Sequence, residues 1–252
     1  MKTFQKDLLK VEIYESRPKM GAAAAEQIKN CFLSLLKEKE TINVIFAAAP
    51  SQNEVLDALV ADTDIPWNRI NAFHMDEYIG LSKDAPQGFG NFLRAHLFDR
   101  VPFRSRNFID ITATDAAAEC DRYAALLREN PTDVVVMGIG ENGHIAFNDP
   151  PVADFADTRA VKPVALDEIC RQQQVNDGCF KTIDDVPKTA ITLTVPTLFA
   201  GKHLFCIVPA KTKANAVRAT LNDEICEACP ATILRRHSSA VLFLDADSSA
   251  LL

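Results

Sequence analysis

The chain has 252 residues, of which 48% are hydrophobic and 24% are charged, as is typical of a globular protein with a sizeable core. Its net charge of −7 argues against binding to the phosphate backbone of nucleic acids, although local positive side chains still permit an anionic small ligand. No apolar run reaches the roughly 18 residues of a membrane span, and the first residues lack the apolar core of a signal peptide, so we expect a cytoplasmic protein without membrane contact.

Predicted strands and helices alternate along the chain. Apolar, β-branched runs indicate strands at residues 11–14, 42–47, 70–73, 134–138, 190–195, 203–208 and 240–244. Helical patterns lie between them at residues 19–37, 54–60, 89–97, 116–129 and 213–221. Such alternation predicts an α/β fold with a mostly parallel sheet covered on both faces, and we expect a single domain over residues 1–252.

The first candidate site follows the strand predicted at residues 42–47, because ligands of open parallel sheets lie beyond the carboxyl ends of the strands. Residues 47–59 read AAAPSQNEVLDAL, in which Ser51 and Glu54 form the S-x-x-E pattern of a capping box. Ser51 would then cap its own helix. Alternatively, the positive end of that helix would bind an anion.

The second candidate site follows the strand predicted at residues 70–73. Asp76 and Glu77 come directly after it, and acids in this position are candidates for proton transfer. A solvated acidic turn is the simpler interpretation of the pair. His74 has no partner at metal-ligand spacing, so we expect it to be packed or to cap an element.

The third candidate site has the G-x-G-x-x-G spacing of a dinucleotide-binding turn, within MGIGENGHIAFNDP at residues 137–150. That interpretation needs a helix after the third glycine, but Pro150 and Pro151 prevent a helix interior. It also needs an acid at the end of the next strand, and residues 157–170 show no clear strand that ends in an acid. We therefore expect no nicotinamide or flavin cofactor.

The polar side chains of the same loop are Asn142, His144 and Asp149. A carboxylate close to an imidazole fixes its tautomer and raises its basicity, which suits the histidine to proton transfer. A purely structural histidine is the alternative.

Cys226 and Cys229 form a C-x-x-C pair near the end of the chain. A zinc site would need two more ligands at matching spacing, and only His237 lies nearby in the sequence. We therefore interpret the cysteines as ordinary reduced thiols and expect no metal.

Taken together, two segments resemble one family. Residues 75–81 read MDEYIGL and residues 138–150 read GIGENGHIAFNDP, with further matches in VPK at 186–188 and ATIL at 231–234. These motifs resemble the glucosamine-6-phosphate deaminase (isomerase) family, relatives of 6-phosphogluconolactonase. The resemblance spans nearly the whole chain and implies a Rossmann-like three-layer sandwich that uses neither a nicotinamide nor a metal. It also implies the conversion of glucosamine 6-phosphate and water into fructose 6-phosphate and ammonia.

The resemblance assigns roles to particular residues. Asp76 would take the C2 proton of the ring-opened sugar and return it at C1, and His144 would open the ring with support from Asn142 and Asp149. The residues implied for binding the sugar phosphate are Ala49, Ser51, Gln52, Gly143 and Lys213. The partner would be a small-molecule sugar phosphate, not a nucleic acid, and a homo-oligomer stays open.

The chain departs from the family pattern in four places. Asn142 stands where an aspartate is usual, and Asp149 stands where a glutamate is usual. The phosphate loop reads AAPSQ at residues 48–52 instead of T-G-G-T-P. Gly178 falls near the place of the family's lid arginine, and Arg171 is a candidate to substitute for it from another position. Two alternatives therefore stay open: a 6-phosphogluconolactonase-type hydrolase, whose motif after the G-H pair differs, or a non-catalytic sugar-phosphate sensor.

Overall fold

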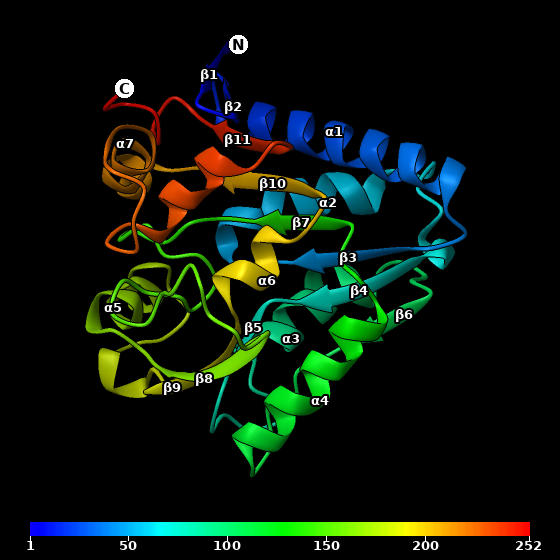
Figure 1. Cartoon of the computed structure of the whole chain (residues 1–252), viewed down its shortest axis with the longest axis vertical. Helices are drawn as coiled ribbons and strands as arrows, with labels where there is room; N and C mark the ends of the chain where they lie inside the picture. Colours follow the sequence, from blue (N-terminus) through cyan, green and yellow to red (C-terminus); the bar gives the residue numbers. More distant parts are fainter.

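A computed structural model describes residues 1–252, and its centre is an eight-stranded sheet (Figure 1). The strand order is β1-β2-β11-β10-β7-β3-β4-β6, and every pair is parallel except β1 with β2. The strands span Lys2–Lys6 (β1), Leu9–Ile13 (β2), Ile42–Phe46 (β3), Ile70–His74 (β4), Ser105–Asn107 (β6), Val134–Met137 (β7), His203–Val208 (β10) and Ala240–Leu244 (β11). The predicted mostly parallel sheet is confirmed.

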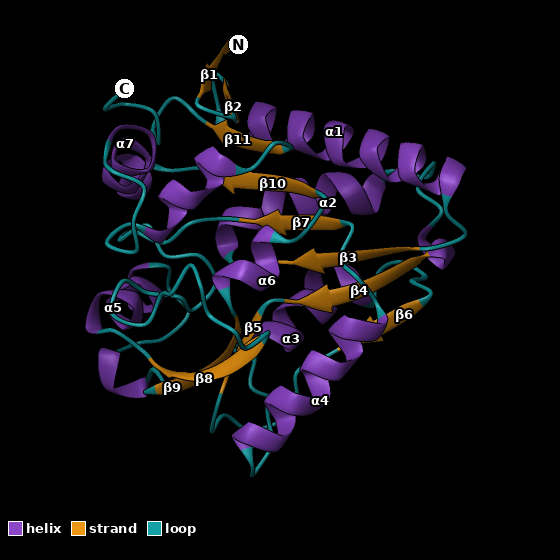
Figure 2. Ribbon diagram, in the orientation of Figure 1, coloured by secondary structure: helices purple, strands orange, loops and turns teal.

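Helices cover both faces of this sheet, so the fold has three layers (Figure 2). Alternate residues of a strand point to opposite faces. In β3, Val44 and Phe46 enter the core beneath α1, α2 and α3, whereas Ile45 enters the core beneath α4 and α7. The helices span Arg17–Glu38 (α1), Asn53–Ala61 (α2), Phe89–Leu93 (α3), Ala116–Glu129 (α4), Glu168–Asn176 (α5), Val195–Phe199 (α6) and Ala214–Asn222 (α7).

The longest helix, α1, follows directly from its sequence. Ser16 caps it by accepting a hydrogen bond from the backbone of Lys19, and a proline occupies its first turn. Its buried stripe includes Met20, Ile28 and Phe32, spaced at helical intervals. The predicted helix at residues 19–37 is thus confirmed, as are the helices predicted at 54–60, 116–129 and 213–221.

A second, smaller sheet is antiparallel and has the order β5-β9-β8. Its strands are Asp76–Tyr78 (β5), Thr189–Leu193 (β9) and Val161–Ala165 (β8). The strand predicted at 190–195 therefore exists, but it is not part of the parallel sheet, and Val195 already belongs to α6. Within residues 157–170 the strand β8 is present, but it ends at Ala165 and not in an acid, as expected.

Several short or polar elements were not predicted: β1, β5, β6, β8, α5 and α6. The helix predicted at 89–97 is α3 followed by a π-helical turn over Arg94–Phe98. None of the helices is long and apolar enough to cross a membrane.

The strand order places a switch point between β3 and β7. From β3 the chain continues outward through β4 and β6, whereas from β7 it continues the other way through β10 and β11. Loops leaving neighbouring strands diverge at such a point and leave a crevice beyond the carboxyl ends of the strands. The three candidate segments of the sequence all leave strands around this crevice.

Candidate active site

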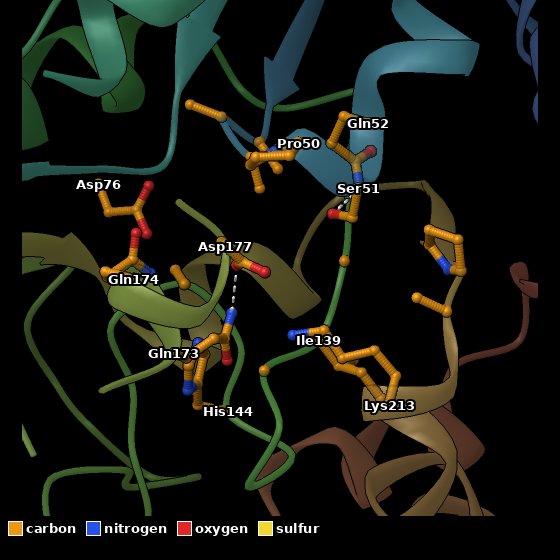
Figure 3. Close-up of a pocket in the computed structure, with 18 of the residues that line it drawn as sticks. Pro50, Ser51, Gln52, Asp76, Ile139, His144, Gln173, Gln174, Asp177 and Lys213 are labelled. Atoms are coloured by element: carbon orange, nitrogen blue, oxygen red, sulfur yellow. Dashed lines mark hydrogen bonds between the residues drawn. The ribbon is translucent and has the colours of Figure 1, made fainter. Parts of the chain in front are cut away.

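A cavity lies at the switch point, and it contains side chains from all three predicted segments (Figure 3). The loop after β3 contributes Ala49, Ser51 and Gln52, the segment after β4 contributes Asp76, and the loop after β7 contributes His144. The loop after β10 adds Lys213, and α5 closes the cavity from the side of the small sheet with Gln173, Gln174 and Asp177.

Asp76 is the first residue of β5 and is 4% exposed. It pairs with Thr192 of β9, so the small antiparallel sheet, and not the end of β4, sets its position. Its Oδ1 has no hydrogen-bond partner although it is buried. Burial, and then the negative charges of Glu77 and Asp149, raise the pKa of Asp76 well above its usual range. A carboxyl in this state accepts and returns a proton readily.

Glu77, the neighbouring acid, has a structural role. Its carboxylate accepts hydrogen bonds from the backbone N–H groups of Tyr78 at 2.9 Å, Phe89 at 3.0 Å and Gly90 at 2.8 Å, the last two in the first turn of α3. Burial raises the pKa of Glu77 to about 7, although these three hydrogen bonds lower it. The solvated acidic turn considered for this pair is wrong, because both acids are buried.

His144 forms a hydrogen-bonded group with Asn142 and Asp149. Its Nδ1 lies 2.8 Å from Oδ1 of Asn142 and 2.9 Å from Oδ1 of Asp149. The amide of Asn142 also donates to Oδ1 of Asp149 at 2.9 Å, so the three side chains hold one another. Burial would raise the pKa of Asp149, but the hydrogen bond and charge of His144 outweigh it and lower that pKa. His144 thus has an orienting carboxylate on one side and the cavity on the other.

The glycines of the loop make room for this arrangement. A Cβ at Gly140 would overlap the imidazole of His144, so only glycine permits the ring to lie over the loop. Gly143 has φ +79 and packs against Cys229, while its carbonyl accepts from the backbone N–H of Ala231 at 2.9 Å. Gly143 therefore serves the shape of the loop and does not line the cavity.

The loop after β3 differs from its expected form. Ser51 lies in a 3-10 turn over Pro50–Gln52, and α2 begins after it with Gln52 at the cap and no side-chain hydrogen bond to the helix. The predicted capping box is therefore wrong, because Glu54 instead pairs with Arg17 at 2.6 Å. Ser51 is left to face the cavity, and its Oγ accepts from Nε2 of Gln52 at 3.2 Å.

Two positively charged side chains, those of Lys213 and Arg17, line the cavity. Lys213 is 5% exposed and its ammonium makes no hydrogen bond or ion pair with the protein. Burial lowers the pKa of Lys213, although the charges of Asp177 and Glu141 oppose that effect. The second cation, Arg17 at the start of α1, was not expected from the sequence. Its guanidinium donates to the carbonyl of Pro50 and so ties α1 to the loop after β3.

Helix α5 supplies a wall that the sequence did not predict. Gln173 is held by the backbone N–H of Glu141 at 2.8 Å. Its amide also donates to Asp177 at 3.3 Å (Figure 3). Gln174 lines the cavity, and its amide makes no hydrogen bond with the protein. This helix has a weak apolar pattern, since its buried residues include Arg171, Gln173 and Gln174, and hydrophobic periodicity could not find it.

Arg171 does not take the place of a lid arginine. Its guanidinium donates to the carbonyl of Val186 at 3.1 Å and to that of Ile183, and it does not line the cavity. The suggestion that Arg171 substitutes from another position is therefore wrong. Its hydrogen bonds tie α5 to the segment that leads into β9, because Val186 precedes that strand.

His74 is packed, as expected. It is fully buried, and its Nε2 accepts from the backbone N–H of Ile109 at 2.9 Å. Burial lowers the pKa of His74 to about 4, so the ring is neutral. All seven cysteines are free thiols, Cys226 and Cys229 among them.

Comparison with known proteins agrees with this geometry. The family described as glucosamine-6-phosphate isomerases/6-phosphogluconolactonase matches residues 15–243. The chain is 35% identical over 234 residues to a glucosamine-6-phosphate deaminase of Exiguobacterium sibiricum, covering 90% of both chains. It is 32% identical over 237 residues to that of Lactobacillus helveticus, covering 94% of this chain and 95% of the relative.

Solved structures show the same architecture. A monomeric glucosamine-6-phosphate deaminase superposes with a TM-score of 0.86 at 28% identity, over 96% of this chain and 99% of the other. The 6-phosphogluconolactonase of Thermotoga maritima shares the fold with a TM-score of 0.76 at 22% identity, over 94% and 99% of the two chains. The protein is thus a member of the glucosamine-6-phosphate isomerase/6-phosphogluconolactonase family.

Proposed function

We propose that the protein converts glucosamine 6-phosphate and water into fructose 6-phosphate and ammonia. One observation carries this proposal: a buried carboxyl with an unpartnered oxygen, Asp76, shares a cavity with the oriented imidazole of His144. Two groups that transfer protons at different points of one substrate are what an aldose–ketose isomerisation requires. Relatives that are glucosamine-6-phosphate deaminases at 32–35% identity support the same reaction.

His144 acts first, by opening the sugar ring. Its Nδ1 is hydrogen-bonded to Asn142 and Asp149, which leaves Nε2 to exchange a proton with the substrate. The ring oxygen gains a proton and the C1 hydroxyl loses one, so that the C1–O5 bond breaks and an aldehyde forms. Asp149 stabilises any positive charge on the imidazole during this step. It thereby supplies the negative charge that the neutral side chain of Asn142 lacks.

Asp76 then moves a proton between two carbons. The substrate ammonium favours the charged carboxylate, because an opposite charge lowers a pKa that burial has raised. The carboxylate takes the C2 proton while the substrate ammonium gives a proton to the C1 oxygen, so that an enolamine forms. The C2 proton is then returned at C1. The resulting C2 iminium adds water and releases ammonia, which completes the balance of the reaction.

The phosphate binds at the other end of the cavity. Lys213 has an ammonium without a protein partner, and Ser51 and Gln52 present polar groups at the start of α2. Arg17 supplies the second positive charge there, in the absence of a lid arginine. The unpartnered amide of Gln174 is left to bind a sugar hydroxyl.

The same site argues against the two alternatives. Lactone hydrolysis needs no base for a carbon acid, whereas the site provides one in Asp76. A sensor needs binding groups but no relay of the kind formed by His144, Asn142 and Asp149. A cytoplasmic location, a homo-oligomer and the lack of a nucleic-acid partner stay as predictions from the sequence.

A substrate panel tests the proposal. Purified protein is incubated with glucosamine 6-phosphate, 6-phosphogluconolactone, glucose 6-phosphate and unphosphorylated glucosamine, and ammonia, ketose and acid release are followed. We expect ammonia and fructose 6-phosphate in equal amounts from the first compound alone. Acid release from the lactone would favour the hydrolase, and thermal stabilisation by sugar phosphates without any turnover would favour the sensor.

A further inference from the structure

Behind the catalytic histidine lies a cysteine that the reaction does not use. Cys170 of α5 is completely buried, and its thiol faces the carboxylate of Asp149. The Sγ of Cys170, a ring nitrogen of His144 and a carboxylate oxygen of Asp149 all lie within 4.8 Å of one another. A sulfur, a nitrogen and an oxygen donor therefore lie close together next to the cavity.

A second feature of this cluster points to a ligand. Oδ2 of Asp149 is buried without an N–H or O–H partner, in a side chain that is 0% exposed. A buried carboxylate oxygen normally accepts hydrogen bonds from such donors. The Cys170 thiol is hydrogen-bonded to the Asp149 carboxylate and would give up this proton to coordinate an ion, while Oδ1 of Asn142 lies only 2.8 Å from Nδ1 of His144 and offers a fourth donor.

The chemistry of these donor atoms determines which metal ion the cluster would prefer. Magnesium and calcium prefer oxygen ligands, whereas a thiolate and an imidazole together favour zinc. Zinc binds sulfur at about 2.3 Å and nitrogen or oxygen at about 2.0 Å in a tetrahedron, so the three donors would need to approach one another by about an ångström. His144 lines the cavity, which gives an ion a path to the cluster.

We propose that His144, Asp149 and Cys170 form a zinc site, and that the bound ion inhibits the enzyme. The ion takes Nδ1 of His144 and one oxygen of Asp149, the ring proton moves to Nε2, and the Cys170 thiol releases its proton. His144 then loses its hydrogen bond to Asp149 and cannot exchange protons with the sugar. Binding itself is independent of the reaction, whereas the inhibition rests on the proposed function.

The test compares the metal-free wild-type protein with Cys170→Ser. Zinc binding is measured by calorimetry, and cobalt is added as a spectroscopic probe because a thiolate ligand gives an intense near-ultraviolet charge-transfer band. Ammonia release from glucosamine 6-phosphate is followed in parallel, with and without a chelator. Cys179→Ser is the matched control, because Cys179 is a half-buried thiol just beyond α5 that is not part of the cluster.

We expect wild type and Cys179→Ser to bind zinc, to show the cobalt band, and to lose activity until the chelator is added. Cys170→Ser should keep its turnover, bind zinc more than about tenfold more weakly, and lack the band. Equal zinc affinity in Cys170→Ser and wild type, or a cobalt band that persists in this variant, overturns the site. If the protein shows the band but no turnover of any sugar phosphate, the zinc site stands and the proposed function fails.

Discussion

Burial governs the chemistry of Asp76. No positive side chain pairs with it, so the pKa of its carboxyl is raised by desolvation and by the charges of Glu77 and Asp149. An isolated carboxyl of this kind responds strongly to the charge of a ligand. The ammonium of an amino sugar supplies the missing positive charge, whereas a neutral sugar phosphate does not. In the proposed reaction, Asp76 would thus contribute to the choice of substrate as well as to proton transfer.

Arg17 provides a test of the phosphate end. Arg17→Ala removes a cation and the bond to the carbonyl of Pro50, so KM for glucosamine 6-phosphate should rise about tenfold with little change in kcat. Arg17→Lys keeps the charge and should recover part of the loss. Steady-state kinetics of both variants measure this, with exposed Lys211→Ala as the control. An unchanged KM in Arg17→Ala would remove Arg17 from the phosphate site.

His74 predicts a pH dependence of stability. Burial lowers the pKa of His74 from 6.5 to about 4, so the unfolded chain binds a proton more tightly than the folded one between these values. Stability is therefore full above pH 6.5 and falls as the pH is lowered toward 4, by about 3 kcal/mol in all. Glu77, with its pKa raised from 4.5 to about 7, titrates with the opposite sign over nearly the same pH range and offsets most of this fall.

Comparison with His74→Gln isolates the histidine, because Glu77 is the same in both proteins and glutamine can still accept from the backbone of Ile109. Urea unfolding at pH 7.5 and pH 5 measures the difference. Lowering the pH should reduce the free energy of unfolding of the wild type relative to that of the variant. The same change in both proteins would mean that His74 is protonated in the folded protein.

At the scale of elements, the loop after β7 packs closely around the imidazole ring of His144. Gly140→Ala would place a methyl group where the imidazole of His144 lies, so the ring must leave its contacts with Asn142 and Asp149. A displacement of about 1 Å costs about a hundredfold in rate, and we expect at least that loss in kcat. Gly178→Ala is the control, because a Cβ there meets no atom and only the strain of φ +76 is added. Full activity of Gly140→Ala would show that His144 does not act from this position.

Sequence patterns predicted some elements well and others poorly. Strands β10 and β11 and helix α4 were predicted at their observed bounds, because apolar runs and a strong helical pattern identify them. Helix α5 was missed, since it buries amides and an arginine, and amide burial has no periodic signature. Those same amides line the cavity, so the missed helix forms part of the candidate site.

Sequence patterns likewise predicted some residues of the candidate site and missed others. Asp76 and His144 follow strands and belong to specific motifs, and the structure brings both to one cavity. Arg17 reaches the cavity from the start of α1, far along the chain from the other residues, and no local pattern marks it. The structural role of Glu77 also depends on α3, which comes close only when the chain folds.

At the scale of the whole molecule, the switch point between β3 and β7 brings the distant segments together. Two hydrophobic cores, one on each face of the sheet, share its strands. A chain whose cores share every central strand should unfold as one unit. We therefore predict a single domain over residues 1–252, with one calorimetric transition whose calorimetric and van't Hoff enthalpies agree. Two separate transitions would contradict this prediction.

The most direct test of the proposed reaction is ammonia release by Asp76→Asn. This variant keeps the shape of the side chain but cannot accept the C2 proton, so kcat for glucosamine 6-phosphate should fall by about a thousandfold or more. Asp177→Asn, a matched change in the same cavity, should lose less than about tenfold, since asparagine can still hold Gln173 and Asp177 acts on Lys213 only through its charge. Stabilisation of Asp76→Asn by the substrate in a thermal shift shows that the site is intact. Ammonia release at the wild-type rate by this variant would contradict the account.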